Sequence, residues 1–193
     1  MPRSPEQNRQ LREETRGRIL EAGLSCFARH GYHATPVRTI AAEAGVSQGL
    51  LYTYYSGKED LLRAIFERTM EEVRSSLAGA EAASDPEEAI VELVRSALAA
   101  VAGQAAFWRL TYQLRMQEDV AAGLGPSLSE WSEAIRGRIE AMLRRAGMER
   151  PELEARTLFA AIDGAAQHYV LDPEGYPAEA VAEAIVRRFT ARR

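Results

Sequence analysis

The chain has 193 residues, of which 46% are hydrophobic and 27% are charged, a composition typical of one globular domain or of a small domain joined to a larger one. Its formal net charge of −4 gives no sign of a polyanion partner for the chain as a whole. Residues 1–60 hold eight Lys and Arg against seven Asp and Glu, so the acidity lies in the remainder of the chain.

Cysteine and histidine are too few to build a covalent or metal framework. One cysteine, Cys26, excludes an internal disulfide, and with only three histidines no zinc-ligand spacing can be assembled. No segment has the roughly 18 apolar residues that span a bilayer, and the polar start MPRSPEQNRQ lacks the apolar region of a signal peptide. We therefore expect a cytoplasmic protein with no metal, cofactor or membrane partner.

The fold class predicted from the spacing of apolar residues is all-α, because nearly every segment has helical periodicity and none alternates as a strand does. Residues 1–14 are polar and are predicted to form a flexible arm. The first helix is expected to end at His30-Gly31, since glycine readily adopts the left-handed conformation that follows a helix. A short second helix is predicted over 36–44, with Thr35 as its N-cap.

A helix-turn-helix motif is predicted next. Gly45 ends the second helix, and Ser47 is the expected cap of a third helix that runs to about Tyr55. Two short helices joined by a few residues around a glycine form this motif, so residues 15–60 are predicted to be a DNA-binding domain. A long fourth helix from Lys58 to about Ala78 leads into a helical body over 61–193, the predicted effector-binding and dimerisation domain.

The body is predicted to consist of further helices. One starts near Pro86 with Asp85 as its cap, and the others are expected over about 104–118, 128–146, 152–171 and 178–191. Gly123-Leu124-Gly125-Pro126 and residues 172–177 are predicted to be loops.

The third predicted helix carries side chains suited to DNA. Gln48 lies in its first turn, where its amide can pair with base edges such as adenine N6 and N7. Gly49 lets the backbone approach the groove wall. Tyr52 and Tyr54 can donate their hydroxyl groups to phosphates, whereas Tyr55 is expected to face inward. The alternative for all three tyrosines is plain packing against neighbouring helices.

Phosphate sites are expected at two helix starts. Lys58 stands at the beginning of the fourth helix, where its charge and the free backbone N–H groups can act on the same phosphate. Thr35 and Arg38 flank the beginning of the second helix and could act in the same way. The alternative for Lys58 is an ordinary surface lysine.

The segment TPVRTIAAEAGVSQGLLYTYYSGKEDLL, with RGRILEAGLSCFARHGYHAT upstream, resembles the DNA-binding head of the TetR/AcrR family of transcriptional regulators. The likeness covers residues 16–65. It implies that Gln48 and Gly49, next to the cap Ser47, lie at the bases, and that five residues bind backbone phosphates: Thr35, Arg38, Tyr52, Tyr54 and Lys58. Three departures from the family pattern concern the packing of the first helix and the cap of the fourth: Gly23, Cys26 and Gly57.

The aromatic stretch QAAFWRLTYQLRMQ, residues 104–117, admits two interpretations. Its large side chains can be plain core, or they can line an apolar cavity with a few polar groups, as small-molecule sites do. The residues predicted to line such a ligand pocket are Phe107, Trp108, Tyr112, Gln113, Met116, Trp131 and Met142. The sequence does not identify the ligand.

The last two predicted helices carry apolar stripes with small residues that let helices approach closely. These stripes can be internal core, or they can form half of a four-helix interface in a homodimer, which is how the family resemblance implies that chains pair. The residues predicted for the dimer interface are Leu158, Ile162, Ala165, Tyr169, Val181, Ile185 and Phe189.

These features predict a sequence-specific, DNA-binding transcriptional regulator. Two recognition helices related by a twofold axis can read a palindromic operator with half-sites about one turn, roughly 34 Å, apart. We therefore expect a dimeric repressor that a small, lipophilic effector releases from double-stranded DNA. An activator and a regulator without a ligand stay open as alternatives.

Two rival classes are an enzyme and a helical adaptor whose helix-turn-helix motif is purely structural. Against an enzyme, the sequence contains no recognisable nucleophile, acid–base pair or set of metal ligands. Asp163 and His168 are five residues apart and do not share a helix face, so His168 is interpreted as a core or interface histidine.

Overall fold

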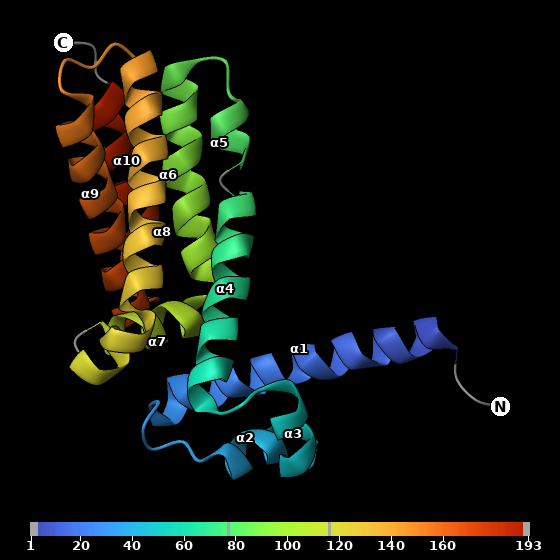
Figure 1. Cartoon of the computed structure of the whole chain (residues 1–193). Helices are drawn as coiled ribbons and strands as arrows, with labels where there is room; N and C mark the ends of the chain where they lie inside the picture. The colour runs from blue at the N-terminus through green and yellow to red at the C-terminus, as the bar shows by residue number, and fades with distance from the viewer. Residues whose placement is uncertain (1–3, 77, 116, 191–193) are drawn as a thin grey trace. The chain divides into compact units, whose positions relative to one another are not determined.

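The computed structural model describes residues 4–76, 78–115 and 117–190, and within them all side chains except those of residues 76, 81 and 118–127. The regular structure in these ranges is helical and contains no strand, as predicted (Figure 1). The chain divides into two compact units, Met1–Thr69 and Met70–Arg193. The division lies within one long helix, nine residues after the boundary predicted from the sequence.

The first unit contains α1 (Pro5–His30), α2 (Val37–Glu43), α3 (Gln48–Tyr54) and the start of α4 (Lys58–Ser76). Each helix contributes apolar side chains to one small core. Its side chains with at most 1% exposure are Ile19, Cys26, Phe27, Ile40, Leu51 and Leu61. The remaining surfaces of α2 and α3 are left to solvent.

The amino-terminal half of α1 is helical, so the prediction of a flexible arm over residues 1–14 is wrong for residues 5–14. A capping box starts the helix: Gln7 N–H donates to Ser4 Oγ at 3.2 Å, and Ser4 N–H donates to Gln7 Oε1 at 3.0 Å. Pro5 follows, where its missing N–H leaves no bond unmade. The sequence shows no apolar periodicity there because this half of the helix is exposed on all sides.

The turn between α2 and α3 is a Schellman motif. Gly45 has φ +65°, its N–H donates to Ala42 O at 3.1 Å, and Val46 N–H donates to Ala41 O at 3.0 Å. A residue with a Cβ is strained at this φ, which is why the sequence places glycine here. The predicted turn and the predicted Ser47 cap are both confirmed, since Ser47 Oγ accepts Leu50 N–H at 3.1 Å.

The predicted cap of α2 is wrong. Pro36 occupies the N-cap position and makes no side-chain bond, whereas Thr35 is 1% exposed. The Thr35 hydroxyl donates to Gly31 O at 2.7 Å and lies 3.3 Å from Cys26 O. Thr35 therefore bonds to carbonyl groups at the carboxyl end of α1 and does not cap the amino end of α2.

The second unit continues α4 and adds α5 (Ala78–Ala82), α6 (Pro86–Gly103), α7 (Ala105–Leu114), α8 (Glu118–Arg145), α9 (Pro151–Leu171) and α10 (Ala178–Thr190). Helix α9 packs against α6, α7, α8 and α10 and is the centre of this unit. The predicted cap of α6 is confirmed, because Asp85 accepts N–H bonds from Glu87 and Glu88, both at 3.3 Å.

One predicted loop of this unit is wrong. Residues 123–126 lie inside α8, although Pro126 cannot donate the backbone bond that its position calls for. Local turn residues are a weak signal that a long helix can override. Residues 172–177 do form the predicted connection. Among the described residues, no single helix is long and apolar enough to cross a bilayer; α6 and α7 pass that test only as a pair, and they meet at a bend of 90°.

Gly23 explains how closely α1 and α4 pack in the first unit. A Cβ at this position would lie 2.9 Å from Leu61 Cδ2 and 3.2 Å from Ile65 Cδ1. Gly17 lies in the same helix, and a Cβ there would meet only Arg68 Nη1, at 4.0 Å. The departure from the family pattern at Gly23 therefore makes room for two core side chains.

This difference predicts that substitution by alanine stabilises the protein at Gly17 and destabilises it at Gly23. Gly17→Ala is expected to raise the free energy of unfolding by up to about 1 kcal/mol through helix propensity. Gly23→Ala gains the same contribution from helix propensity, but overpacking against Leu61 lowers the free energy of unfolding by about 1–3 kcal/mol. Urea denaturation of both variants measures the difference, and equal stabilisation by the two substitutions would contradict the close packing.

Candidate functional site

Helix α3 presents one face to the core and the opposite face to solvent. Leu51 is 1% exposed and Tyr55 is 4% exposed, which confirms the prediction that Tyr55 faces inward. Gln48 and Gly49 are exposed in the first turn, and Tyr52 is 49% exposed one turn later. A Cβ on Gly49 would meet nothing within 4 Å, so this face has room for close approach of another molecule.

Two features of this surface were not predicted. Leu50 on α3 is 41% exposed, although exposure to water does not stabilise an apolar side chain. The Arg12 guanidinium of α1 lies 5.8 Å from the ring centroid of Tyr54, which is half-buried. The capping box at Ser4 and Gln7 was the sequence signal that could have extended α1 and placed Arg12 beside α3.

Lys58 holds two segments of the first unit together. Its ammonium group donates to Tyr32 O at 2.9 Å and to His33 O at 3.1 Å, and it lies 4.9 Å from the Tyr32 ring centroid. The chain's single lysine thus joins the start of α4 to the loop after α1, unlike an ordinary surface lysine. Two of its three N–H donors are used in this way.

The start of α4 is capped from within the helix. Gly57 precedes Lys58 and offers no side chain, but Asp60 accepts Ser56 N–H at 2.9 Å and Ser56 Oγ–H at 3.2 Å. The carboxylate also places negative charge in the first turn, where the helix dipole favours it. Asp60 thereby replaces the cap that Gly57 cannot provide.

The eight residues predicted to face DNA divide clearly. Seven lie wholly or partly at the surface of the first unit: Arg38, Ser47, Gln48, Gly49, Tyr52, Tyr54 and Lys58. Thr35 does not, because its side chain is buried and its hydroxyl is bonded to backbone carbonyls. The Thr35 hydroxyl is therefore not free for a phosphate in this conformation, and the phosphate contact predicted for Thr35 stays a prediction.

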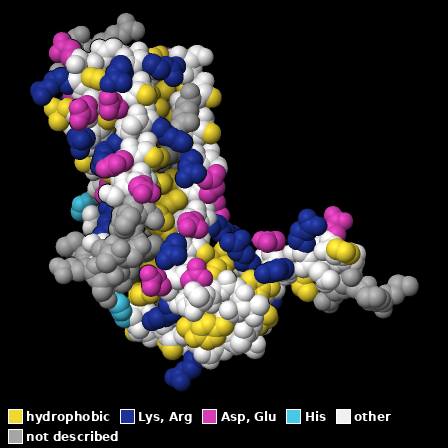
Figure 2. Space-filling view, in the orientation of Figure 1, with side chains coloured by type: hydrophobic (Ala, Val, Ile, Leu, Met, Phe, Trp, Pro, Cys, Tyr) yellow, Lys and Arg dark blue, Asp and Glu magenta, His cyan; other side chains and the backbone are white. Residues whose placement is uncertain are grey.

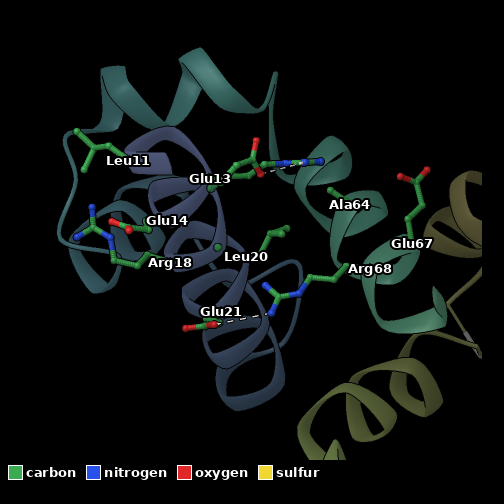
Figure 3. A pocket seen from close by; sticks show the side chains of 11 residues that line it. Leu11, Glu13, Glu14, Arg18, Leu20, Glu21, Ala64, Glu67 and Arg68 are labelled. Atoms are coloured by element: carbon green, nitrogen blue, oxygen red, sulfur yellow. Dashed lines mark ion pairs between the residues drawn. The ribbon is translucent and has the colours of Figure 1, made fainter. Parts of the chain in front are cut away.

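A groove of mixed charge lies between α1 and α4 of the first unit (Figure 3). Glu13 pairs with Arg16 and Glu21 pairs with Arg68, both at 3.9 Å. Because both acidic and basic side chains line its walls, the groove offers no field of one sign to a ligand.

The second unit contains an apolar cavity of about 50 Å³. Of the residues predicted for a ligand pocket, Trp108, Tyr112 and Trp131 line it. The other lining residues are Val73, Leu93, Ala97, Val101, Ile135, Ile139, Phe159, Ile162, Asp163 and Ala166. The cavity therefore draws its walls from α4, α6, α7, α8 and α9.

The other residues predicted for the pocket do not line this cavity. Phe107 and Met142 are buried in the core but do not line the cavity, and Gln113 is exposed. Helix periodicity explains Gln113, which follows Tyr112 by one residue and so points to a different side of α7. Met116 lies outside the described residues.

The tryptophans of the cavity form an aromatic cluster. The ring centroids of Trp108 and Trp131 are 6.2 Å apart, Trp108 is 6.2 Å from Tyr112, and Trp131 is 6.5 Å from Phe159. The indole Nε1 atoms of Trp108 and Trp131 are buried, and no described residue accepts a hydrogen bond from them. Buried donors without acceptors are uncommon in proteins, because each loses its bond to water.

One polar cluster closes a side of the cavity. Arg115 donates to both carboxylate oxygens of Asp163, at 2.8 and 3.1 Å, and the Tyr112 hydroxyl lies 3.3 Å from Asp163 Oδ1. Burial raises the pKa of Tyr112 well above its usual range, and the Asp163 carboxylate adds to this rise. Asp163, which the sequence analysis considered only as a catalytic candidate, is thus a paired residue in the cavity wall.

Most residues predicted for the dimer interface lie inside the second unit. Leu158, Ala165, Ile185 and Phe189 are at most 8% exposed within a single chain, so they are core residues and the interface prediction is wrong for them. Ile162 lines the cavity. Tyr169 and Val181 are half-buried and stay candidates. The two apolar stripes follow the core because α9 buries its widest apolar face against α6, α7 and α8, and α10 buries its own against α6 and α9.

The outer surface of α9 has a different composition. Leu153 is 47% exposed and Leu171 is 74% exposed, and between them lie the small residues Ala160 and Gly164. A Cβ on Gly164 would meet nothing within 4 Å. His168 is exposed and stacks on Tyr176 with a centroid distance of 5.9 Å, so of the two interpretations of His168 the structure excludes the core residue and leaves the interface residue as a prediction.

Comparison with known families identifies both units. The family model described as "Bacterial regulatory proteins, tetR family" matches residues 19–65, and the model described as "Tetracyclin repressor-like, C-terminal domain" matches residues 84–192. The second match alone covers more than half of the chain. The chain belongs to the TetR family. The TetR-family head coincides with the unit that carries the exposed face of α3, and the C-terminal match contains most of the cavity.

Individual relatives support this assignment to the TetR family. The HTH-type transcriptional repressor LfrR of Mycolicibacterium smegmatis is 28% identical over 97% of this chain and 95% of its own length. A fatty acid metabolism regulator protein of Bacillus subtilis is 40% identical over 52 residues, which span only 27% of either chain. The crystal structure of the regulator FadR from Bacillus subtilis in complex with stearoyl-CoA has a TM-score of 0.76 at 20% identity, over 90% of this chain and 97% of that one.

Proposed function

We propose that the chain is a sequence-specific DNA-binding repressor, whose homodimer leaves a palindromic operator when a small lipophilic ligand binds. The observation that carries the proposal is the orientation of α3. Leu51 and Tyr55 anchor the helix in the core, while Gln48, Gly49 and Tyr52 share its exposed face. A helix held in this way can enter a major groove without any loss of core contacts.

The exposed residues divide into base-reading and phosphate-binding groups. Gln48 has the only side-chain amide in the first turn of α3, and an amide can bond bidentately to adenine. Tyr52 and Arg38 are exposed on α3 and α2 and can donate to phosphates on either side of the groove. Lys58 keeps one N–H donor for a phosphate beyond its two carbonyl bonds.

This assignment predicts a sequence-dependent effect of Gln48. Gln48→Ala is expected to weaken binding to the operator by about 1–3 kcal/mol and to leave binding to unrelated duplexes unchanged, because only a base contact is lost. Anisotropy of a labelled duplex from the region upstream of the gene, titrated with competitor present, measures both affinities. Gln113→Ala is the control, since it removes an exposed glutamine from the second unit. Equal operator binding by Gln48→Ala and wild type would contradict base reading, and no operator preference in wild type would favour a structural adaptor.

The outer surface of α9 supports the homodimer. Leu153, Ala160, Gly164 and Leu171 are spaced by seven, four and seven residues, so they share one face along the whole helix. The two leucines are exposed in the single chain, and the small residues between them allow a second helix to approach closely. Ala180 and Ala184 of α10 are also exposed and small. We therefore assign the interface to this face, not to the buried stripe predicted from the sequence.

The interface assignment predicts different outcomes for two open glycines. Gly164→Glu is expected to convert the dimer into a monomer, because it buries a carboxylate without a partner at the centre of the interface. Gly137→Glu is the matched control: Gly137 lies in α8, and a Cβ there also meets nothing within 4 Å. Sedimentation velocity of both variants gives the mass of each species, and a dimeric Gly164→Glu would place the interface elsewhere.

The cavity supports a small lipophilic ligand with at least one hydrogen-bond acceptor. Its walls are apolar apart from Asp163 and the tyrosine hydroxyl, and the two indole N–H groups lack acceptors among the described residues. A carbonyl, ether or ester oxygen between the tryptophans would satisfy them. The FadR crystal structure with stearoyl-CoA shows a protein of this fold in complex with an acyl-CoA.

Binding in this cavity requires the helices to move. At about 50 Å³ the cavity is far smaller than the roughly 300–1,000 Å³ of typical ligand sites, so a ligand must push its walls apart. Val73 of α4 forms one wall, and the same uninterrupted helix begins at Lys58 beside the loop that follows α1. Displacement of Val73 would therefore be transmitted along α4 to the residues that support α3. A coupling of about 1–3 kcal/mol would change the DNA affinity by about 5- to 150-fold.

Both tryptophans of the chain line the cavity, so intrinsic fluorescence should report occupancy. A ligand that lowers DNA affinity by about 5- to 150-fold is expected to alter the emission of Trp108→Phe and of Trp131→Phe, each of which retains one reporter. Acyl-CoA and free fatty acids of graded chain length are suitable first probes. A ligand that changes DNA affinity without changing either emission would place the effector site outside this cavity.

A further inference from the structure

Aromatic side chains form a large part of the cavity wall in the second unit. Aromatic residues make up 7% of the chain, yet four of the residues that line the cavity are aromatic: Trp108, Tyr112, Trp131 and Phe159. Their rings contact one another in inclined pairs, with centroid distances of 6.2–6.5 Å. Because the closed cavity holds only about 50 Å³, a ligand must part some of these rings before it makes contacts of its own.

An aromatic ligand can replace the ring contacts that it breaks. Trp108 and Trp131 are inclined to each other by 55°, so a flat ring that stacks on one indole turns its edge toward the other. Stacked carbon atoms lie roughly 3.5 Å apart, so a flat ring separates the walls by little more than this distance. A saturated ring or chain is thicker, because its hydrogen atoms project on every side. It also gives up the attraction between rings, which contributes about 2- to 10-fold in affinity for each pair.

Two buried N–H groups of the wall have no acceptor. Trp108 is 5% exposed, and its Nε1 atom and that of Trp131 are buried without an acceptor among the described residues. These donors have already lost their bonds to water, so a carbonyl oxygen of the ligand gains a hydrogen bond without further desolvation of the protein. The Tyr112 hydroxyl is not available in this way, because it donates to Asp163 at 3.3 Å. The tryptophans are therefore the donors that the wall offers to a ligand.

The cavity is unsuited to a charged ligand. Figure 2 shows acidic and basic side chains interspersed over the visible face of the second unit, whereas Asp163 is the one charged residue among the described residues that line the cavity. Arg115 donates to both oxygens of this carboxylate, at 2.8 and 3.1 Å, so its charge is already paired. A ligand of either sign would bring an unpaired charge into an apolar space, which is strongly unfavourable. These contacts favour a neutral ligand.

We propose that the effector of this cavity is a neutral, flat aromatic carbonyl compound. Its ring stacks on one of the two indoles, and its carbonyl oxygen accepts the N–H group of the other. Trp108 and Trp131 then determine specificity twice, since their rings select a flat ligand and their N–H groups select an acceptor. This inference rests on the proposed function and narrows the ligand to one chemical class, which binds more tightly than saturated fatty chains.

Three compounds of similar size test the shape and the carbonyl group separately. Fluorenone is flat and carries a carbonyl group, fluorene has a methylene group in its place, and cyclotridecanone is a saturated ketone with as many carbon atoms. In isothermal titration calorimetry, fluorenone is expected to bind wild type about tenfold more tightly than cyclotridecanone, because only fluorenone makes ring contacts. Fluorenone carboxylate, which is charged, should bind at least about tenfold more weakly than fluorenone.

Two variants test the carbonyl contact, since phenylalanine keeps an aromatic ring and lacks the N–H donor. In Trp108→Phe or Trp131→Phe, whichever removes the bonded donor, the ratio of fluorenone affinity to fluorene affinity is expected to fall by about 2- to 10-fold. Changes in cavity shape that affect both compounds alike cancel in this ratio. Tyr176→Phe is the matched control, because it removes a polar group from an aromatic residue outside the cavity and should retain the wild-type ratio.

The outcomes separate the ligand class from the proposed function. The inference would be overturned by no binding of fluorenone, by equal binding of fluorenone and either cyclotridecanone or fluorenone carboxylate, or by a ratio that is unchanged in both tryptophan variants. A saturated fatty acid that releases DNA and binds more tightly than fluorenone would also overturn it and leave the proposed function intact. Fluorenone binding with the expected pattern but without loss of DNA affinity would support the ligand class and contradict release from the operator.

Discussion

The burial of Leu51 and Tyr55 is the constraint on which the exposed face of α3 depends. A first unit of this size can bury only one small core, so every helix in it must give up one side to that core. Once α3 is held by residues four positions apart, its opposite side is determined by helix geometry alone. The Schellman turn at Gly45 and the Lys58 bonds to the loop after α1 then fix where that side points within the unit.

The turn and cap residues, which act through local backbone bonds, were the features best predicted from the sequence. Gly45, Ser47 and Asp85 act through their own backbone or through neighbours three residues away, and all three do what their residue types indicate. The N-cap prediction for Thr35 was wrong because its hydroxyl could bond either to an N–H group at the start of α2 or to carbonyl groups at the end of α1. In the fold it bonds to the carbonyl groups of α1. The exposed half of α1 was missed because it has no core to face and therefore no apolar period.

The pattern of apolar residues alone could not predict which faces of the second unit are buried and which are exposed. A stripe such as Leu158, Ala165 and Ala166 of α9 looks the same whether it faces its own chain or a second copy. The tryptophans predicted for a pocket line the cavity, whereas Asp163 was not predicted there, since its pairing with Arg115 joins α9 to the end of α7. Pairings across a bundle depend on helix rotation, which single-sequence periodicity does not determine.

The small volume of the cavity has a consequence for effector concentration. If the ligand-accepting form must be opened first, only a fraction of molecules is competent at any moment, and the apparent dissociation constant is the intrinsic one divided by that fraction. An opening that costs about 1.4 kcal/mol raises the apparent constant about tenfold. If the cavity is the effector site proposed above, its closed form sets a concentration threshold: DNA affinity would change only at ligand concentrations that populate the open form.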